Sequence, residues 1–145
     1  MDAIDFQIVE NLLSDGRITM KELAQRVGLS SPATMDRVKK LEDAGVISGY
    51  KALVDIHKVG LPIRAFIFVK VNNAAGKPFT SFCAAHNSVL SCHRIAGDTD
   101  YVLEVATASV AALEQVIDEF MRYGLTRTHV VLSSLVEQKA INLPR

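Results

Sequence analysis

The chain of 145 residues lacks features that mark several protein classes. It has two cysteines, Cys83 and Cys92, which are too few for a disulfide-stapled scaffold. Its first residues, MDAIDFQIVENL, are acidic and amphipathic, so no signal peptide is expected. No apolar run approaches the length of a membrane span. These absences favour a globular cytoplasmic protein that does not bind a membrane.

An excess of charge of one sign is also missing. Lys+Arg and Asp+Glu each number 16, and residues 1–58 carry eight basic against nine acidic side chains. Any binding to nucleic acid must therefore depend on the local placement of cations. The nucleophile elbow, the P-loop, GxGxxG and HExxH are absent too, so we expect neither an enzyme nor a cofactor.

Residues 19–45 predict two short helices joined by a turn. Thr19 and Glu22 have the spacing of a capping box, Gly28 suits a left-handed helix end, and Ser30 or Ser31 can cap the second helix. Helical spacing assigns a buried face to Leu23, Ala24, Val27, Thr34, Val38 and Leu41. This pattern is typical of a helix-turn-helix, which places its second helix in the major groove of DNA.

The outward side of that second helix is rich in cations. The same spacing leaves Ala33, Met35, Asp36, Arg37, Lys39 and Lys40 outward. Candidate phosphate contacts are Arg37, Lys39, Lys40, Lys51 and Arg17. An apolar helical stripe precedes the motif at residues 4–13, and VISGYKALVD at 46–55 predicts a short strand or β-wing. We therefore expect a winged helix-turn-helix over residues 1–56 and a hinge at 57–62.

The remaining residues, 63–145, predict a second domain of mixed type. Strands are expected at 63–72, 89–95, 101–107 and 126–136, with helices at 78–86 and after the cap Ser109. The last helix should turn Leu113, Val116, Ile117, Phe120 and Met121 inward and end at Gly124. The order is βαββαβ, a ferredoxin-like unit, and the fold class of the chain is α+β.

Two aromatic side chains on the first strand of this domain predict self-association. Alternation places Phe66 and Phe68 on the face opposite the aliphatic side chains that meet the helices. An exposed apolar sheet face usually marks an interface, so we expect dimers that pair sheet to sheet.

A metal or redox site is an alternative use of Cys83, His86, Cys92 and His93. Cys83 and His86 share a helical face, but Cys92 and His93 are neighbours on a strand and point to opposite faces. A four-ligand zinc site is therefore not expected.

Four segments carry a resemblance that runs nearly end to end. In their order, DGRITMKELAQRVGLS, RVKKLEDAGVISGY, AGDTDY and THVVLSSL resemble the Lrp/AsnC (feast/famine) family of bacterial and archaeal transcription regulators. The resemblance implies a winged helix-turn-helix followed by a ferredoxin-like ligand-sensing (RAM) domain. It also implies a free amino acid as effector and homo-oligomers, dimers that typically assemble into octamers.

The resemblance also assigns site residues. It maps the DNA-recognition helix onto residues 31–42, with Ser31, Met35, Arg37, Lys39 and Lys40 as DNA contacts. Among these, the fork of Arg37 suits a guanine edge, and Lys39 and Lys40 suit phosphates.

The family's effector pocket lies at a dimer–dimer contact around a G-D-x-D-Y turn. Here the resemblance gives the turn residues Gly97, Asp98, Thr99, Asp100 and Tyr101 and the strand residues Thr128, His129, Val130 and Val131. Asp98 or Asp100 can hold the ammonium of an amino acid. Gly, Asp and Thr are also common turn residues, so the same segment could be a β-hairpin turn without a ligand.

A second function stays open alongside a sequence-specific, effector-responsive regulator. The chain could be an architectural protein that bends or wraps DNA with little sequence preference, although zero net charge argues against it. Ferredoxin-like domains also host enzymes, so the fold alone does not exclude catalysis.

Overall fold

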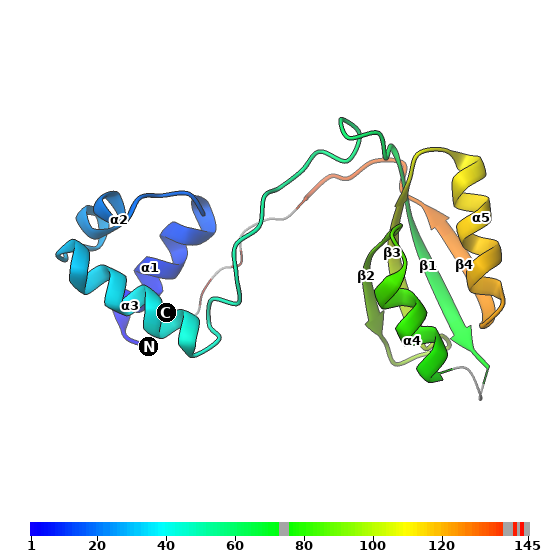
Figure 1. The fold of residues 1–145 in the computed structure, drawn as a ribbon, viewed down its shortest axis with the longest axis horizontal. Coiled ribbons are helices and arrows are strands. Elements are labelled where there is room, and N and C mark those ends of the chain that lie inside the picture. Colours follow the sequence, from blue (N-terminus) through cyan, green and yellow to red (C-terminus); the bar gives the residue numbers. More distant parts are fainter. Residues whose placement is uncertain (73–75, 138–140, 142, 144–145) are drawn as a thin grey trace. The chain divides into compact units, whose positions relative to one another are not determined.

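The computed structural model describes residues 1–72, 76–137, 141 and 143. The elements of Figure 1 are, in chain order, α1 (Ala3–Ser14), α2 (Met20–Val27), α3 (Ser31–Asp43), β1 (Ile63–Val71), α4 (Gly76–Ala85), β2 (Val89–Arg94), β3 (Tyr101–Thr107), α5 (Val110–Met121) and β4 (Gly124–Val130). They fall into two compact units, Met1–Leu53 with Val136–Arg145, and Val54–Leu135. The described residues after 135, which are Val136, Glu137, Ile141 and Leu143, group with the first unit, whereas we expected them in a domain of residues 63–145. Residues 138–140, 142, 144 and 145 of that expected domain lie outside the described residues.

Helix caps set the bounds of α1, α2 and α3. The predicted capping box of Thr19 and Glu22 opens α2, and a second box of Asp2 and Asp5 opens α1. Gly28 ends α2 at a φ of 70°, in the left-handed region that glycine adopts without strain. Ser30 then caps α3 by accepting the Ala33 N–H. The chain thus makes the expected helix-turn-helix from local signals.

The core of the first unit joins α1 to the helix pair. Its buried apolar side chains are Ile8, Val9, Ile18, Leu23, Val27, Val38 and Leu41, and the partly buried Leu143 packs against them. Thr34 is also fully buried, and its hydroxyl donates to the Ser30 carbonyl at 3.0 Å. The buried face predicted for α2 and α3 is confirmed.

We expect Ser30→Ala to lower the free energy of unfolding of the first unit by about 1 kcal/mol, the usual value of an N-cap. The substitution leaves the first amides of α3 without the serine oxygen. Urea unfolding followed by far-ultraviolet circular dichroism measures the change. Ser31→Ala, one residue along in the same helix, is the matched control, and equal losses in the two variants would contradict the assignment of the cap.

The β-wing expected at residues 46–55 does not form. Residues 46–55, all of which the structure describes, contain no strand. Val46, Tyr50, Leu53 and Val54 are instead exposed. A strand needs a partner backbone for its hydrogen bonds, and β-propensity alone supplies none.

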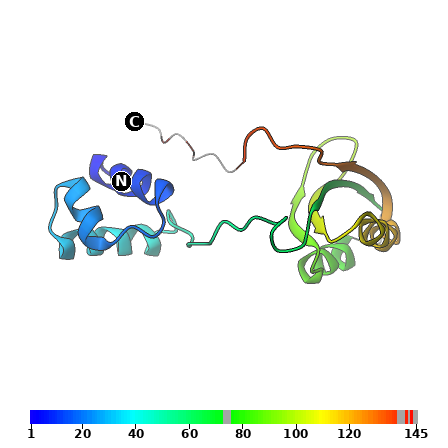
Figure 2. The ribbon, with the colours of Figure 1, turned by 90° about the horizontal axis from the view of Figure 1, so that it is seen from above.

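The second unit is a four-stranded sheet in the order β2-β3-β1-β4. Every pair of neighbouring strands is antiparallel, and α4 and α5 lie on one face of the sheet (Figures 1 and 2). Alternation along β1 turns Ala65, Ile67 and Val69 toward the helices, where Phe79 and Phe120 complete the core. The predicted βαββαβ order is confirmed, and the two units together make an α+β chain.

Two details of this unit differ from the sequence prediction. β4 ends at Val130 instead of residue 136, because its partner β1 begins at Ile63 and pairs Val130 with Ala65. One further bond, from the Val131 N–H to the Arg64 carbonyl, uses the remaining length of β1. Met121 is also 57 % exposed rather than inward, since α5 ends there and Gly124 already opens β4.

Candidate DNA-binding helix and effector region

One side of α3 is free of the protein core. Thr34, Val38 and Leu41 are buried, and on the other side Met35 is 56 % exposed. Lys39 and Lys40 are exposed as well, and Ser31 is half-buried at the first turn. The Ser30 cap sets the start of α3, and its buried face packs in the core with α1 and α2. Asp36 is exposed too, so Met35, Asp36, Lys39 and Lys40 form a short ridge of one apolar, one acidic and two cationic groups.

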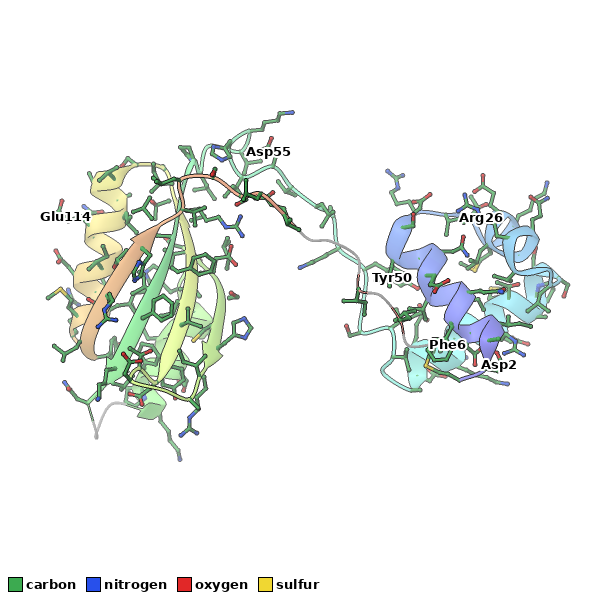
Figure 3. All side chains as sticks on the ribbon, turned by 180° about the vertical axis from the view of Figure 1, so that it is seen from behind. Asp2, Phe6, Arg26, Tyr50, Asp55 and Glu114 are labelled. Atoms are coloured by element: carbon green, nitrogen blue, oxygen red, sulfur yellow. The ribbon has the colours of Figure 1, made fainter. Side chains whose placement is uncertain are left out.

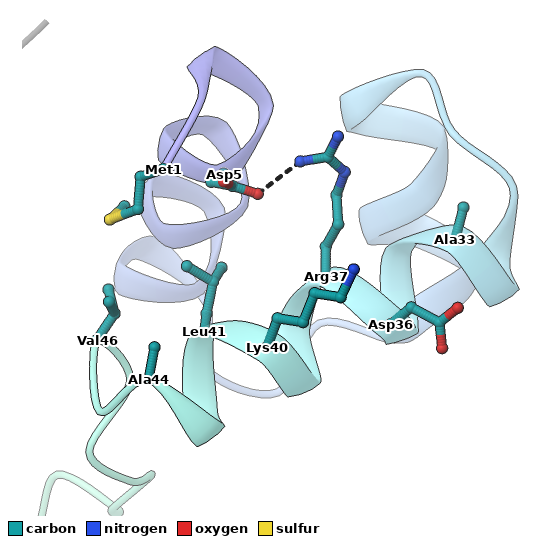
Figure 4. A pocket seen from close by; sticks show the side chains of 9 residues that line it. All are labelled: Met1, Asp5, Ala33, Asp36, Arg37, Lys40, Leu41, Ala44 and Val46. Carbon is teal, nitrogen blue, oxygen red and sulfur yellow. Dashed lines mark hydrogen bonds and ion pairs between the residues drawn. The ribbon is translucent and has the colours of Figure 1, made fainter.

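Arg37 lies differently from the prediction. Its Nη1 donates to Asp2 Oδ2 at 2.8 Å and to Asp5 Oδ1 at 2.7 Å, and its side chain is 31 % exposed. Figure 4 shows the side chain leaving α3 toward the first turn of α1. Arg37 therefore lies at the surface but is not free as predicted, because two carboxylates of α1 hold its guanidinium.

Hydrogen bonding shifts the pKa values of Asp2 and Arg37. The Asp5 amide and then the Arg37 side chain lower the pKa of Asp2, because both stabilise its carboxylate. Asp5 and then Asp2 raise the pKa of Arg37. The pKa shifts of Asp2 and Arg37 both favour their charged forms.

The sequence predicts the two carboxylates of this ion pair but not their partner. Asp2 and Asp5 have the i, i+3 spacing of a capping box, which is visible from the sequence. Their partner is 35 and 32 residues away, and only the packing of α1 on α3 brings it close.

A hollow of about 440 Å³ opens beside this ion pair (Figure 4). Its lining combines apolar and charged side chains of both signs: Met1, Asp5, Ala33, Asp36, Arg37, Lys40, Leu41, Ala44 and Val46.

Arg17 and Lys51, the other predicted phosphate contacts, are exposed. The hydroxyl of Tyr50 (Figure 3) donates to Glu42 Oε1 at 3.0 Å, which ties the segment after α3 to that helix.

The turn before β3 uses one of its carboxylates structurally. Asp100 Oδ2 accepts the Val71 N–H at 2.8 Å, and the Asp100 N–H donates to the Val69 carbonyl at 3.0 Å. Asp98 is exposed and Thr99 is half-buried. Tyr101 packs its ring 4.8 Å from that of Phe79, on the helix side of the sheet. Of the two predicted ammonium ligands, Asp98 is the more accessible.

The strand part of the predicted pocket is split between the two faces of the sheet. Thr128 and Val130 pair with the buried Ile67 and Ala65. His129 and Val131 therefore point to the opposite face. Within one chain these residues do not close a pocket with the turn, because Tyr101 and Val130 pair with β1 residues four positions apart, about 13 Å along the strand.

The face of the sheet opposite α4 and α5 carries Phe66 and Phe68. Phe66 is 36 % exposed and sits between Glu104 and His129 in the register. Phe68 is half-buried, and its ring meets that of His129 edge-on at 5.5 Å. Arg64 Nε donates to Glu104 on the same face. Among the described residues of this unit, no helix lies on this face.

Cys83 and His86 are engaged in packing and hydrogen bonding. Burial, and then the neighbouring Cys92, raise the pKa of the Cys83 thiol to about 12. His86 Nδ1 accepts the Ser88 N–H, and its Nε2 lies 3.2 Å from Glu119 Oε2, so both ring nitrogens have partners. Across the described ranges, no three His, Cys, Asp or Glu side chains gather as metal ligands would. No helix within those ranges is long and apolar enough to cross a membrane.

Comparison with known proteins places both units. Residues 1–48 match the family model described as winged helix-turn-helix DNA-binding, and residues 64–141 match that of the Lrp/AsnC ligand binding domain. The chain is 45 % identical to YezC, an HTH-type transcriptional regulator of Bacillus subtilis, over 92 % of this chain and 95 % of YezC.

Solved structures of related regulators support the same family. That of Bacillus subtilis LrpC is 36 % identical with a TM-score of 0.89, covering 94 % of this chain and 97 % of LrpC. The regulator NMB0573 of Neisseria meningitidis, solved with L-Met, is 29 % identical with a TM-score of 0.93, covering 98 % and 96 % of the two chains. With the helix-turn-helix and the ferredoxin-like sheet in place, these matches show that the chain is a member of the Lrp/AsnC family of DNA-binding transcriptional regulators.

Proposed function

We propose that this regulator reads duplex DNA with α3 and that a free amino acid, bound in the second unit, changes its assembly or its affinity for DNA. The observation that carries the proposal is the exposed side of α3. Met35, Lys39 and Lys40 project from a helix whose opposite side is fixed in the core. That is the arrangement by which a recognition helix enters the major groove.

The side chains on this side of α3 take different roles in the proposal. Met35 offers an apolar contact for a thymine methyl group, and Ser31 can bond either to a base edge or to phosphate. Lys39 and Lys40 contact phosphates as point charges. Since residues 1–58 are not basic overall, one such helix binds weakly, and several must act together. Dimers that pair their sheets through Phe66 and Phe68, and octamers built from them, bring the helices together.

We expect Lys39→Ala and Lys40→Ala each to weaken binding to all duplexes alike. Each lost phosphate contact lowers the slope of log affinity against log salt by about 0.9. Fluorescence anisotropy with the native promoter and a random duplex, across a salt series, measures both quantities. Lys77→Ala, an exposed lysine in the second unit, is the matched control. Unchanged binding in both α3 variants would refute the helix assignment, and equal affinity of the wild-type protein for both duplexes would favour an architectural role.

The effector part of the proposal rests on chemistry and likeness. Residues 64–141 match a ligand-binding domain, and the related Neisseria regulator was solved with L-Met. Asp98 is exposed and can pair with the ammonium of an amino acid, while turn amides and hydroxyls suit its carboxylate. Gly97, Asp98, Thr99, Asp100 and Tyr101 form one wall. Of the strand residues, Thr128 and Val130 line the helix face of the sheet and His129 and Val131 line the other, so each pair contributes only on its own face. Because one chain does not close the pocket, a second chain completes it.

Isothermal titration calorimetry with each of the twenty amino acids tests the effector. We expect heat from one or a few of them, with a change in the size distribution of the protein. Asp98→Asn removes a charge-assisted bond and weakens binding roughly tenfold or more. Asp118→Asn, an exposed carboxylate on α5, is the control. No heat and no change in size with any amino acid would contradict this part of the proposal and leave the DNA-binding part standing.

A further inference from the structure

Arg37 sits in a closed network that joins the middle of α3 to the first turn of α1. A single guanidinium nitrogen, Nη1, donates to both Asp2 and Asp5, at 2.8 and 2.7 Å. Figure 4 shows the Asp5 contact beside Leu41, whose buried side chain belongs to the core between the helices. The ion pairs of Arg37 and the apolar packing of Leu41 therefore both join α3 to α1.

The two carboxylates are themselves fixed by the helix cap. Asp2 Oδ1 accepts the Asp5 N–H at 3.0 Å, and Asp5 Oδ2 accepts the Asp2 N–H at 2.9 Å. Each carboxylate thus gives one oxygen to the cap and the other to Arg37. Because the cap already holds both carboxylates in place, forming the network orders only the side chain of Arg37.

A guanine contact would exchange these bonds for others of the same kind. Arg37 would leave two charge-assisted hydrogen bonds for two on a base edge. It would also leave the Asp2 and Asp5 carboxylates without their cation, close to DNA phosphates that repel them. Met35, Lys39 and Lys40 reach the solvent without breaking any such network, since their neighbours on α3 carry the packing.

We infer that Arg37 is a positioning residue that, through Asp2 and Asp5, sets the orientation of α3 on α1, and that the reading of bases falls to the exposed side chains around Met35. The inference rests on the proposed function, in which α3 enters the major groove. It makes the first residues of the chain part of the DNA-reading device, although they face α3 rather than DNA. Loss of the network should tilt the whole ridge and disturb every base contact together.

A base-preference measurement on the full-length protein separates this role from direct reading. Binding to an operator library with each position varied gives the preference at every base pair. We expect Arg37→Ala to weaken operator binding about tenfold, the cost of roughly one mismatched base pair, with preference lowered at all positions. We expect Asp5→Asn to give the same profile. The double variant should be no weaker than Arg37→Ala, because both substitutions break one network.

Two controls complete the design. Asp43→Asn removes the same charge from an exposed site at the end of α3, so it corrects for the general gain in affinity from losing an acid. Arg37→Lys keeps a cation for the two carboxylates, and we expect it to retain the preference profile even if Arg37→Ala does not fold. The salt slope should stay unchanged in Arg37→Ala and fall in Lys40→Ala.

The opposite result is equally distinct. If Arg37→Ala loses preference at a single G·C pair while Asp5→Asn keeps or sharpens it, Arg37 reads that base and the inference is overturned. Lys39→Ala and Lys40→Ala report separately on the proposed function, because a failed recognition-helix assignment leaves binding unchanged in those variants, whatever Arg37 does.

Discussion

Gly124→Ala should unfold the second unit under conditions in which the unmodified chain is stable. A Cβ atom at this position would lie 2.0 Å from the Lys70 carbonyl oxygen, 2.9 Å from its carbonyl carbon and 3.0 Å from the Val71 Cα. All three are backbone atoms of β1, so no side-chain rotation relieves the overlap. The first residues of β4 must move off β1 instead.

The cost is large because β1 is the inner strand to which β4 is bonded. The register pairs Gly124 with Val71, and the Asn72 N–H donates to the Tyr123 carbonyl at 2.9 Å. We expect a loss of more than about 3 kcal/mol, above the usual range for overpacking, because the clash is with backbone. Thermal and urea unfolding measure it.

Gly76→Ala is the matched control for this prediction. Gly76 opens α4, and an added Cβ there would meet no atom within 4 Å. Alanine is the better helix former, so we expect a change within about 1 kcal/mol, in the stabilising direction. Equal unfolding midpoints for the two variants would show that β1 and β4 do not approach so closely.

Phe66→Asp should separate the dimers that we propose. Phe66 and Phe68 lie on the sheet face opposite the helices, and burying one phenylalanine contributes about 1.5–3 kcal/mol. In a two-fold symmetric dimer each substitution occurs twice, so the loss is roughly 3–6 kcal/mol. The dissociation constant would then rise about 10²-fold to 10⁴-fold.

Sedimentation equilibrium at micromolar concentration measures this loss, and operator binding should fall with it because single helices bind weakly. Val110→Asp is the control. Val110 is 69 % exposed at the first turn of α5, where an acid suits the helix dipole. Unmodified protein that is already monomeric, or a Phe66→Asp variant that stays dimeric, would contradict the sheet-to-sheet pairing.

Local signals in the sequence predict much of this fold. The Thr19–Glu22 box, the Ser30 cap and the positive φ of Gly28 act within a few residues, so their effect can be read without knowing the rest of the chain. Alternation along residues 63–71 likewise separates the helix-facing side chains from Phe66 and Phe68, because a strand has a fixed period of two.

The wing and the length of β4 depend on partners that local patterns do not specify. Residues 46–55 have the composition of a strand, but a strand forms only where another backbone accepts and donates its bonds. β4 stops at Val130 for the same reason, since β1 has almost no further residues to pair with.

The helix-turn-helix, the βαββαβ order, the exposed lysines of α3 and the turn around Asp98 follow from the amino-acid sequence, because caps, periods and turn residues act at short range. Tertiary packing was needed to show where Arg37 points, that Asp100 bonds to the Val71 amide, and that the two predicted walls of the effector pocket stay apart in one chain. The physical reason is that a charged or polar side chain takes whichever partner packing brings within hydrogen-bond distance. Asp2 and Asp5 are more than thirty residues from Arg37 in the chain, so no local sequence pattern predicts that they pair.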